Sequence, residues 1–478
     1  MPTIDRNSPA PFYYQVYEQI AHGIESGLYP AGKKLPSIRE CARELGVSNT
    51  TIELAYQRLT EEGYVSARRG SGYTICANDL KPSNPTEEYD AEYQDALSEL
   101  LEEDANFKTR ANQRYNFAYD VVDASIFPFT AWSRISREIY FSQGAELSCM
   151  YNDRQGLPEL RKQIAQYLSS EYGLNCLPEQ ILVMPTTRDL MSSIMSLFDP
   201  DSTTFAMEEP GYDEVRRGLQ LLGFNVKTNP IFPFPTWEEA RPNVEGANVV
   251  FTTPACQFPT NHPMPIDLRK GLVKWAEETN AYLIDDEYGW EFQSGVARIP
   301  SLAALDRVGR VISLGTFSNS FSPAICLSYA VLPPQLMVEW QRKYRDSHPQ
   351  VPWQTQASMA AFMREGLWRT HIRKVRTAAH NKRRQLLKSL TERMGNLIEI
   401  VEGQSSLFVL VKTNDGRTED ELIEVAAKAD VCVYPTLRYW AGEAPEDWRY
   451  VLIGYAGIPY DAIDAGVATL ARAWGLAE

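Results

Sequence analysis

LGTFSNSFSPAICLSY, residues 314–329, continues an apolar stretch, RVISLGT (310–316), that has the length of a buried β-strand. Amphipathic, helix-like segments separate this stretch from four earlier apolar stretches. Strands that alternate with helices in this way form a mostly parallel sheet covered on both faces. The sequence therefore predicts an α/β fold for residues 114–478. The four earlier strand candidates are ILVMP (181–185), TTFAME (203–208), NVVFTTP (248–254) and AYLIDDEY (281–288).

The chain after about Pro333 has a different pattern. Long helical segments come first, and a smaller α+β lobe follows, with the strand candidates SSLFVLV (405–411) and VLIGYA (451–456). The predicted large domain thus combines a mostly parallel sheet with a smaller carboxy-terminal lobe.

Several motifs of this domain are similar to those of class I aminotransferases of fold type I, which bind pyridoxal phosphate (PLP). Residues 314–329 resemble the lysine segment of these enzymes in the form carried by MocR-type regulators of the GntR superfamily, GTFSKxLxPxLRLGY. The resemblance covers nearly all of residues 114–478 and implies a fold-type I domain that dimerises. Other matching segments are FPFTAWSR (127–134), YNDRQGLPELRKQIAQYL (151–168), PTTRDLM (185–191), EEPGY (208–212), TTPACQFPTNHPM (252–264) and IDDEYGWEF (284–292).

Two reactive positions of the lysine segment differ in this chain. The family has a lysine that forms the Schiff base with PLP and an arginine that holds its phosphate, and Asn319 and Cys326 stand at these positions. An amide cannot condense with an aldehyde, because its lone pair is delocalised into the carbonyl. A thiol cannot replace the guanidinium fork, and each lost charge-assisted bond costs about 1.5–3 kcal/mol. We therefore expect no covalent PLP, which leaves noncovalent binding of PLP or pyridoxamine phosphate open.

Deliberate replacement of the lysine by engineering would explain Asn319 but would not explain Cys326. The second, unrelated loss at Cys326 favours natural divergence.

The rest of the predicted ligand pocket follows from the same resemblance. It implies that Asp286 pairs with the pyridinium nitrogen, that Tyr288 contacts the ring oxygen and that Tyr212 stacks on the ring. Asp286 can equally be a strand-end carboxylate that backbone N–H groups satisfy. The segment 185–191 replaces a loop usually written SGAQQAL, in which backbone N–H groups meet an anion at a helix start. The candidate pocket residues are Asp286, Tyr288, Tyr212, Thr186, Thr187, Arg188 and Ser318.

Residues 1–76 carry the signals of a helix-turn-helix. Apolar residues at helical spacing predict a first helix over about 11–26. A second helix begins near Ser37, a turn follows at Gly46, and Ser48 is placed to cap a third helix.

A wing completes this module. Two short strands, 64–68 and 73–76, flank a glycine-containing turn. Residues 35–75 resemble the GntR winged helix, LPSxRxLAxxLGVSRxTVxxAYxxLxxEGYLxxRxGSGxxV, whose third helix enters the major groove of DNA. The resemblance implies that DNA is contacted by Arg39, Ser48, Asn49, Thr50, Thr51, Arg68, Arg69 and Gly72.

One of these residues departs from the family pattern. Asn49 stands where the family usually has arginine. Asparagine reads adenine whereas arginine prefers guanine, so we expect an altered operator preference. Residues 1–76 contain eight basic and eight acidic residues, and this net charge of zero predicts weak nonspecific binding and a need for dimeric half-sites.

Two further charged segments have more than one interpretation. Residues 77–113 form an acidic connector that contains a helical portion, which either docks on a partner surface or is a solvated spacer. HIRKVRTAAHNKRR (371–384) is a basic helical run that is mainly structural in the resembling family, or else a second DNA contact.

The composition excludes several classes of protein. A net charge of −15 has the wrong sign for a chain whose whole surface attracts DNA, so the DNA contact has to be local. The seven cysteines are scattered and form no CxxC pair, which fits free thiols in a reducing cytosol and no metal site. The first residues do not resemble a signal peptide, and no apolar run reaches membrane-spanning length.

These features predict a cytoplasmic transcriptional regulator that binds a double-stranded DNA operator as a head-to-tail homodimer and senses an unknown small-molecule effector. One alternative is a PLP-dependent aminotransferase with a DNA-binding appendage, but without the amine it has no group for transimination or for moving the α-proton. A second is a regulator that holds PLP or pyridoxamine phosphate noncovalently through Asp286, Tyr288, Tyr212 and Arg188. A third is a sensor of an unrelated molecule in the vacated cavity.

Overall fold

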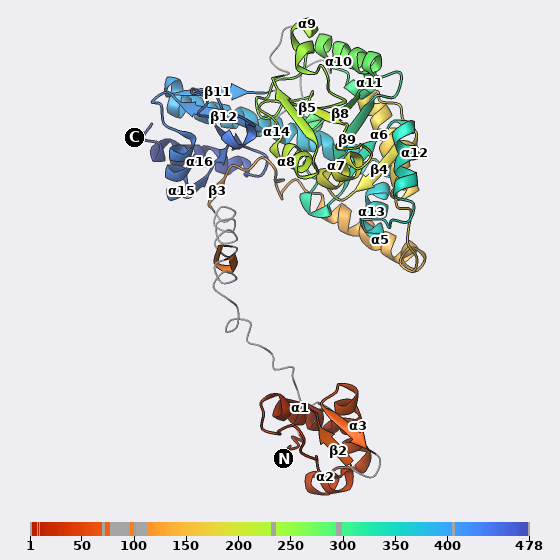
Figure 1. The fold of residues 1–478 in the computed structure, drawn as a ribbon. Helices are drawn as coiled ribbons and strands as arrows, with labels where there is room; N and C mark the ends of the chain where they lie inside the picture. Colours follow the sequence, from red (N-terminus) through yellow and green to blue (C-terminus); the bar gives the residue numbers. More distant parts are fainter. Residues whose placement is uncertain are drawn as a thin grey trace. The chain divides into compact units, whose positions relative to one another are not determined.

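The computed structural model describes residues 2–6, 8, 10–68, 72–76, 96–99, 101, 113–230, 236–292, 299–403 and 407–476. It forms two compact units, Met1–Ala105 and Asn106–Glu478, which we describe separately (Figure 1). The expected acidic connector, 77–113, lies almost entirely outside the described residues. The domain boundaries at residues 76 and 113 therefore stay predictions.

The first unit is a helical core with a two-stranded wing. The helices of its core are α1 (Phe12–Glu25), α2 (Ile38–Leu45) and α3 (Asn49–Glu61). α1 and α2 both pack against α3. The core is formed by apolar side chains at helical spacing, among them Val16, Ile20, Cys41, Ile52, Ala55, Tyr56 and Leu59.

Local sequence signals explain where these helices end and begin. α2 ends at Gly46, whose φ of 63° is a left-handed conformation that glycine adopts without strain. Ser48 caps α3, because its hydroxyl accepts a hydrogen bond from the Thr51 N–H at 3.1 Å. β1 (Val65–Arg68) pairs antiparallel with β2 (Gly72–Ile75), so each strand begins within one residue of its expected start. The expected winged helix-turn-helix is confirmed, while the turn at residues 69–71 lies outside the described residues.

The second unit is built on a seven-stranded sheet in the order β4-β10-β9-β8-β7-β5-β6. All neighbours pair in parallel except β10, which runs antiparallel to both β4 and β9. The expected α/β fold with a mostly parallel sheet is confirmed. The strands are β4 (Ile181–Met184), β5 (Thr204–Glu208), β6 (Asn225–Asn229), β7 (Val249–Thr252), β8 (Tyr282–Asp286), β9 (Val311–Thr316) and β10 (Ser328–Val331).

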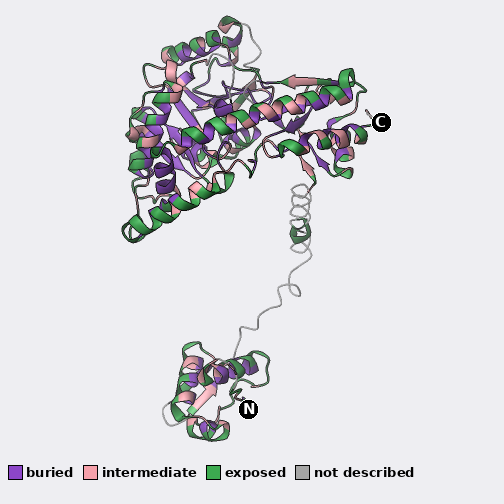
Figure 2. Cartoon of the chain, turned by 180° about the vertical axis from the view of Figure 1, so that it is seen from behind, coloured by how far each residue is buried: buried purple, intermediate pink, exposed green. Residues whose placement is uncertain are grey.

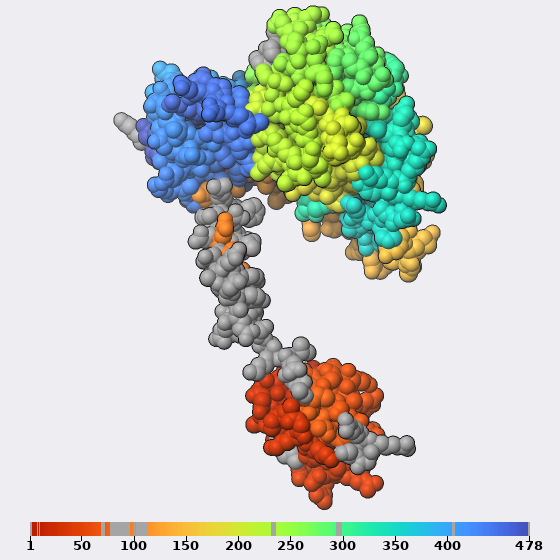
Figure 3. All heavy atoms as spheres, viewed as in Figure 1, coloured from red at the N-terminus to blue at the C-terminus, as the bar shows by residue number. Residues whose placement is uncertain are grey.

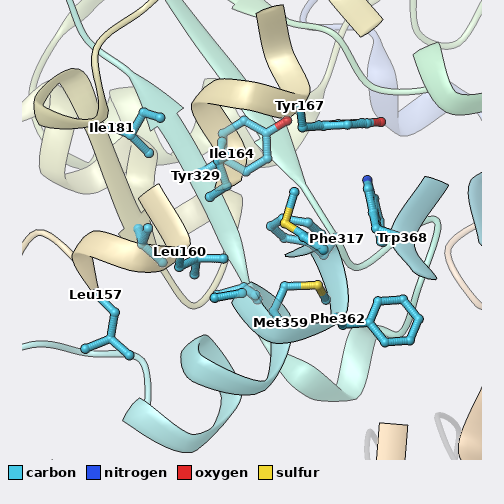
Figure 4. Close-up of a cluster of buried hydrophobic side chains, with 14 of the residues drawn as sticks. Leu157, Leu160, Ile164, Tyr167, Ile181, Phe317, Tyr329, Met359, Phe362 and Trp368 are labelled. Carbon is cyan, nitrogen blue, oxygen red and sulfur yellow. The ribbon is translucent and has the colours of Figure 1, made fainter. Parts of the chain in front are cut away.

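Helices cover both faces of this sheet, which is why its strands read as continuous apolar runs (Figure 2). Alternate residues of β4 show the two faces: Leu182 and Met184 share one core with α7, α8 and α12, whereas Ile181 and Val183 share another with α6 and α13. Figure 4 shows part of the second core. The helices are α5 (Phe129–Leu147), α6 (Pro158–Tyr167), α7 (Thr187–Met195), α8 (Asp213–Leu221), α9 (Trp237–Ala240), α10 (Ile266–Thr279), α11 (Leu302–Leu305), α12 (Pro334–Lys343) and α13 (Trp353–Arg364).

The carboxy-terminal residues form the smaller lobe that the sequence predicts. α14 (Leu367–Met394) leads into an antiparallel sheet in the order β11-β12-β15-β14. In Figure 3 this lobe, in blue, lies against the larger lobe, in green. None of the described helices combines the length and the apolar character that are needed to cross a membrane. The remaining elements of the lobe are β3 (Tyr115–Asn116), β11 (Ile398–Glu402), β12 (Phe408–Thr413), α15 (Glu419–Lys428), β13 (Val431–Cys432), β14 (Tyr434–Pro435), β15 (Val451–Gly454) and α16 (Tyr460–Ala473).

Candidate functional site

A pocket lies at the carboxyl ends of the neighbouring strands β8 and β9. Asp286 is the last residue of β8 and pairs in register with Leu314 of β9, and Asn319 follows the end of β9. Asp286, Tyr288 and Asn319 line one small pocket that is partly open to solvent. Ligands of open α/β sheets bind at such strand ends. The structure therefore brings together three of the residues that the sequence singles out.

Several polar residues of this pocket were not among the sequence candidates, and they include two glutamates and a tyrosine. Glu287 and Glu291 belong to the same segment as Asp286, and Tyr172 comes from the turn that extends α6. The Tyr172 hydroxyl donates a hydrogen bond to Glu291 Oε1 at 3.2 Å. The run of carboxyl groups in 284–292 was a visible signal for the two glutamates. Tyr172 is more than a hundred residues away in sequence, and only the folding of the chain places it here.

The carboxyl groups of the pocket resist ionisation. Burial raises the pKa of Asp286 to about 7, and the neighbouring Asp285 adds to this shift. Burial also raises the pKa of Glu291 to about 7, although the hydrogen bond from Tyr172 opposes it. Desolvation penalises each negative charge, and the charges repel one another. A pocket with this lining favours a proton or another cation.

Among the three acidic residues that line the pocket, Asp286, Glu287 and Glu291, Glu287 is the most deeply buried. Its side chain is 3% exposed, and Arg269 of α10 lies 3.2 Å from its Oε1. Burial and Asp285 raise the pKa of Glu287, and the Arg269 guanidinium opposes the shift. Glu287 Oε2 and Asp285 Oδ1 are also buried, and neither accepts a hydrogen bond from another described group. A proton shared between the two carboxyls would satisfy both oxygens, and so would a donor from a bound molecule.

Two aromatic candidates, Tyr212 and Tyr288, both contact Phe258. Their ring centroids are 5.7 Å and 6.1 Å from that of Phe258, in edge-on contacts. Tyr212 caps the start of α8, and its hydroxyl donates a 3.5 Å hydrogen bond to Glu214. Burial and the Cys256 thiol raise the pKa of Tyr288. Both phenols therefore stay neutral at physiological pH, and both are held by packing against Phe258.

The expected phosphate loop begins α7, and its polar groups bond to each other. Thr186 and Asp189 form a capping box. Asp189 Oδ2 accepts one hydrogen bond from the N–H of Thr186 at 3.1 Å and another from the hydroxyl of Thr186 at 2.7 Å. Arg188 is 74% exposed, and its guanidinium lies 3.5 Å from the Glu214 carboxylate. Thr187, the first residue of α7, is half-buried. None of these three candidates, Thr186, Thr187 or Arg188, lines the pocket that contains Asp286.

The remaining candidates lie in the segment that follows β9. The Ser318 N–H donates to the Thr316 hydroxyl at 3.1 Å. The Cys326 thiol is exposed and lies 3.6 Å from the Pro323 carbonyl oxygen of its own loop. Cys326 also has a φ of 45°. Neither residue is among those that line the pocket.

The DNA-binding candidates of the first unit lie at helix starts and in the wing. Ser48, Asn49 and Thr50 are exposed where α3 begins, and Arg39 is exposed near the start of α2. The Thr51 hydroxyl is 2.8 Å from that of Ser48, so part of the role of these two residues is to cap α3. Gly72 begins β2 with a φ of 80°, which favours glycine. Of the other two candidates, Arg68 belongs to β1 with a side chain that is not described, and Arg69 lies outside the described residues.

Two family models match the chain. Residues 12–75 match "Bacterial regulatory proteins, gntR family", and residues 131–449 match "Aminotransferase class I and II". The first match covers the winged helix-turn-helix, and the second covers the sheet, the pocket and part of the smaller lobe.

Curated relatives match nearly the whole chain, and solved aminotransferase structures match about three quarters of it. The chain is 32% identical over 479 residues to the uncharacterized HTH-type transcriptional regulator YhdI of Bacillus subtilis, a match that covers 99% of this chain and 98% of the relative. It is 27% identical to the probable rhizopine catabolism regulatory protein MocR of Rhizobium meliloti, covering 99% and 96%. The crystal structure of LysN, an alpha-aminoadipate aminotransferase from Thermus thermophilus, superposes with a TM-score of 0.69 at 22% identity and covers 77% of this chain and 94% of LysN. The chain therefore belongs to the HTH-type transcriptional regulators that join a GntR-family domain to an aminotransferase class I and II domain, and it is a DNA-binding regulator of transcription.

Proposed function

We propose that this regulator binds an operator through its first unit and senses a small ligand in its second unit without forming a Schiff base. The observation that carries the proposal is the position of Asn319 in the pocket beside Asp286 and Tyr288. None of the described residues that line this pocket is a lysine. An amide cannot form the covalent link on which aminotransferase chemistry depends. The pocket therefore serves recognition, and we expect no transamination.

The DNA half of the proposal rests on the start of α3. An exposed Ser48, Asn49 and Thr50 at a helix amino terminus suit contacts to bases and phosphates in the major groove. The operator is then double-stranded DNA, and the place of action is the bacterial cytoplasm.

The homodimer is supported by four exposed aromatic or apolar side chains on α5 and in the segment that follows it. Tyr140, Phe141, Met150 and Tyr151, which we call the α5 apolar surface, are 57%, 81%, 61% and 76% exposed. Apolar groups gathered on a protein surface commonly mark an interface with another chain. We propose that a second copy of this chain covers the α5 apolar surface.

Absorption spectroscopy with added PLP tests the central claim. The wild-type protein should show no Schiff-base absorption, and after borohydride treatment peptide mass spectrometry should find no phosphopyridoxyl group on it. Asn319→Lys should give weak Schiff-base formation, because it restores the amine but not the charge at Cys326. Asn319→Lys with Cys326→Arg should bind PLP about tenfold or more tighter than Asn319→Lys alone, as one charge-assisted bond is worth roughly 1.5–3 kcal/mol.

A matched control is Asn319→Lys with Cys149→Arg, because Cys149 is also an exposed free cysteine. This control should behave like Asn319→Lys alone. A phosphopyridoxyl group trapped on a lysine of the wild-type protein would contradict the proposal. Full affinity with Asn319→Lys alone would show that Cys326 is irrelevant.

A further inference from the structure

The chain offers little to the phosphate of a PLP-like ligand. At the start of α7, where the resembling enzymes bind phosphate, the Asp189 carboxylate already accepts the N–H and the hydroxyl of Thr186. This carboxylate places a negative charge where an anion would have to bind. The only charged candidate of the loop, Arg188, is paired with Glu214 on the surface. The Cys326 thiol lies against its own loop and carries no positive charge.

The pocket itself is lined by acidic groups and favours a positively charged ligand. Asp286, Glu287 and Glu291 all line it. Glu287 Oε2 is buried and has no hydrogen-bond partner among the described residues. An unsatisfied buried acceptor calls for a donor, and a ligand N–H group reaching Glu287 from the pocket would supply one.

The aromatic lining suits the same kind of ligand. Tyr172 and Tyr288 line the pocket together with the acids. Tyr172 is held in place by stacking on Trp290, with ring centroids 4.7 Å apart. The faces of tyrosine rings attract organic cations. Rings and carboxylates in one pocket are the combination that binds a protonated amine on a carbon skeleton.

We infer that the ligand of this pocket is a small organic cation that carries a protonated amine and no phosphate, bound by the carboxyl groups of Asp286, Glu287 and Glu291. The inference rests on the proposed function, in which the second unit senses a small molecule. It also separates this chain from PLP-binding relatives of the same fold, because their ligand is an anion and this one is a cation. The argument for an organic rather than a metal cation is the aromatic lining, because Tyr172 and Tyr288 offer ring faces beside the carboxyl groups.

Calorimetric titration of the full-length protein with two matched pairs of probes tests the inference. Benzylamine and benzyl alcohol have nearly the same shape and differ in charge. Pyridoxamine and pyridoxamine 5′-phosphate differ only in the phosphate. We expect benzylamine to bind at least tenfold tighter than benzyl alcohol, and pyridoxamine at least tenfold tighter than its phosphate. Equal binding within either pair, tighter binding of the phosphate, or no binding of either amine would overturn the inference.

Variants locate the binding. Glu291→Gln keeps the size of the side chain and should abolish the preference for benzylamine over benzyl alcohol, and Asp286→Asn should weaken it. The matched control is Glu277→Gln near the carboxyl end of α10, which leads into the opposite end of β8. This control should bind like the wild type. If Glu291→Gln and Asp286→Asn are both folded and both keep the full preference, the cation does not bind at these carboxyls.

A third variant tests the exclusion of phosphate. Asp189→Asn removes the negative charge at the start of α7 and should raise the affinity for pyridoxamine 5′-phosphate severalfold without changing that for pyridoxamine. An unchanged ratio of the two affinities would contradict the role assigned to Asp189.

The same samples distinguish this inference from the proposed function. DNA binding is measured by mobility shift on the region upstream of the protein's own gene, with and without each probe. If pyridoxamine 5′-phosphate binds noncovalently, and tighter than pyridoxamine, and alters the shift, the inference is wrong but the proposed function stands. A Schiff base on the wild-type chain would overturn both.

Discussion

A single carboxyl group, that of Asp286, links the pocket to the stability of the fold. Burial, with Asp285, Glu208 and Glu291, raises its pKa from 3.8 to about 7, although a backbone N–H at Tyr288 opposes the shift. Between these values the folded chain keeps a proton that the unfolded chain has lost, so this contribution to stability is present at low pH and is lost as the pH rises through about 7. Asp286→Asn should therefore stabilise the protein more at pH 8 than at pH 5, by about 1 kcal/mol or more, because stability is lost throughout the window between the two pKa values. Thermal unfolding at the two pH values measures the difference, and Asp461→Asn on the exposed start of α16 is the control. An identical effect at both pH values would show that Asp286 ionises normally.

At the scale of an element, the start of α3 combines two roles that substitution can separate. Ser48 accepts the Thr51 N–H and lies on the exposed surface proposed to face DNA. Ser48→Ala removes the cap and should cost α3 about 1 kcal/mol, seen as faster hydrogen exchange of its amides. Ser48→Asp keeps a cap, because a carboxylate also accepts at this position, but it places a negative charge toward the phosphates. It should therefore retain slow exchange and still lose DNA binding in a mobility-shift assay. If Ser48→Asp binds DNA as well as the wild type, Ser48 does not approach the DNA backbone.

At the scale of the whole molecule, the α5 apolar surface predicts that the protein is a homodimer. Phe141, which is 81% exposed, would be buried against a second copy, so Phe141→Glu places a charge in an apolar contact. Sedimentation at micromolar concentration should show a mass that falls from two chains toward one. Leu221 of α8 is 88% exposed and lies outside the α5 apolar surface, and Leu221→Glu should leave the mass unchanged. A wild-type protein that sediments as one chain, or a Phe141→Glu protein that stays dimeric, would contradict this assembly.

Local patterns in the sequence were sufficient for most of the fold. Five of the seven strands of the large sheet were predicted, because each is a compact apolar run between helices. The helix-turn-helix was equally visible, since Ser37, Gly46 and Ser48 act on their immediate neighbours. β6 and β10 were not predicted as strands. β6 is a polar edge strand, and β10 is a short strand that pairs with the preceding strand β9 and with β4, which is distant in sequence.

The sequence by itself was sufficient to recognise the family of each domain. It also marked Asn319 and Asp286 as candidate site residues, because both stand in recognisable motifs. Only the tertiary structure decided what surrounds them. It brought Tyr172 to Glu291 and turned Arg188 toward Glu214. Motifs and helix caps depend on residues close together in the chain, whereas the charge of a pocket depends on which distant side chains converge there. That convergence is set by packing, and no local pattern records it.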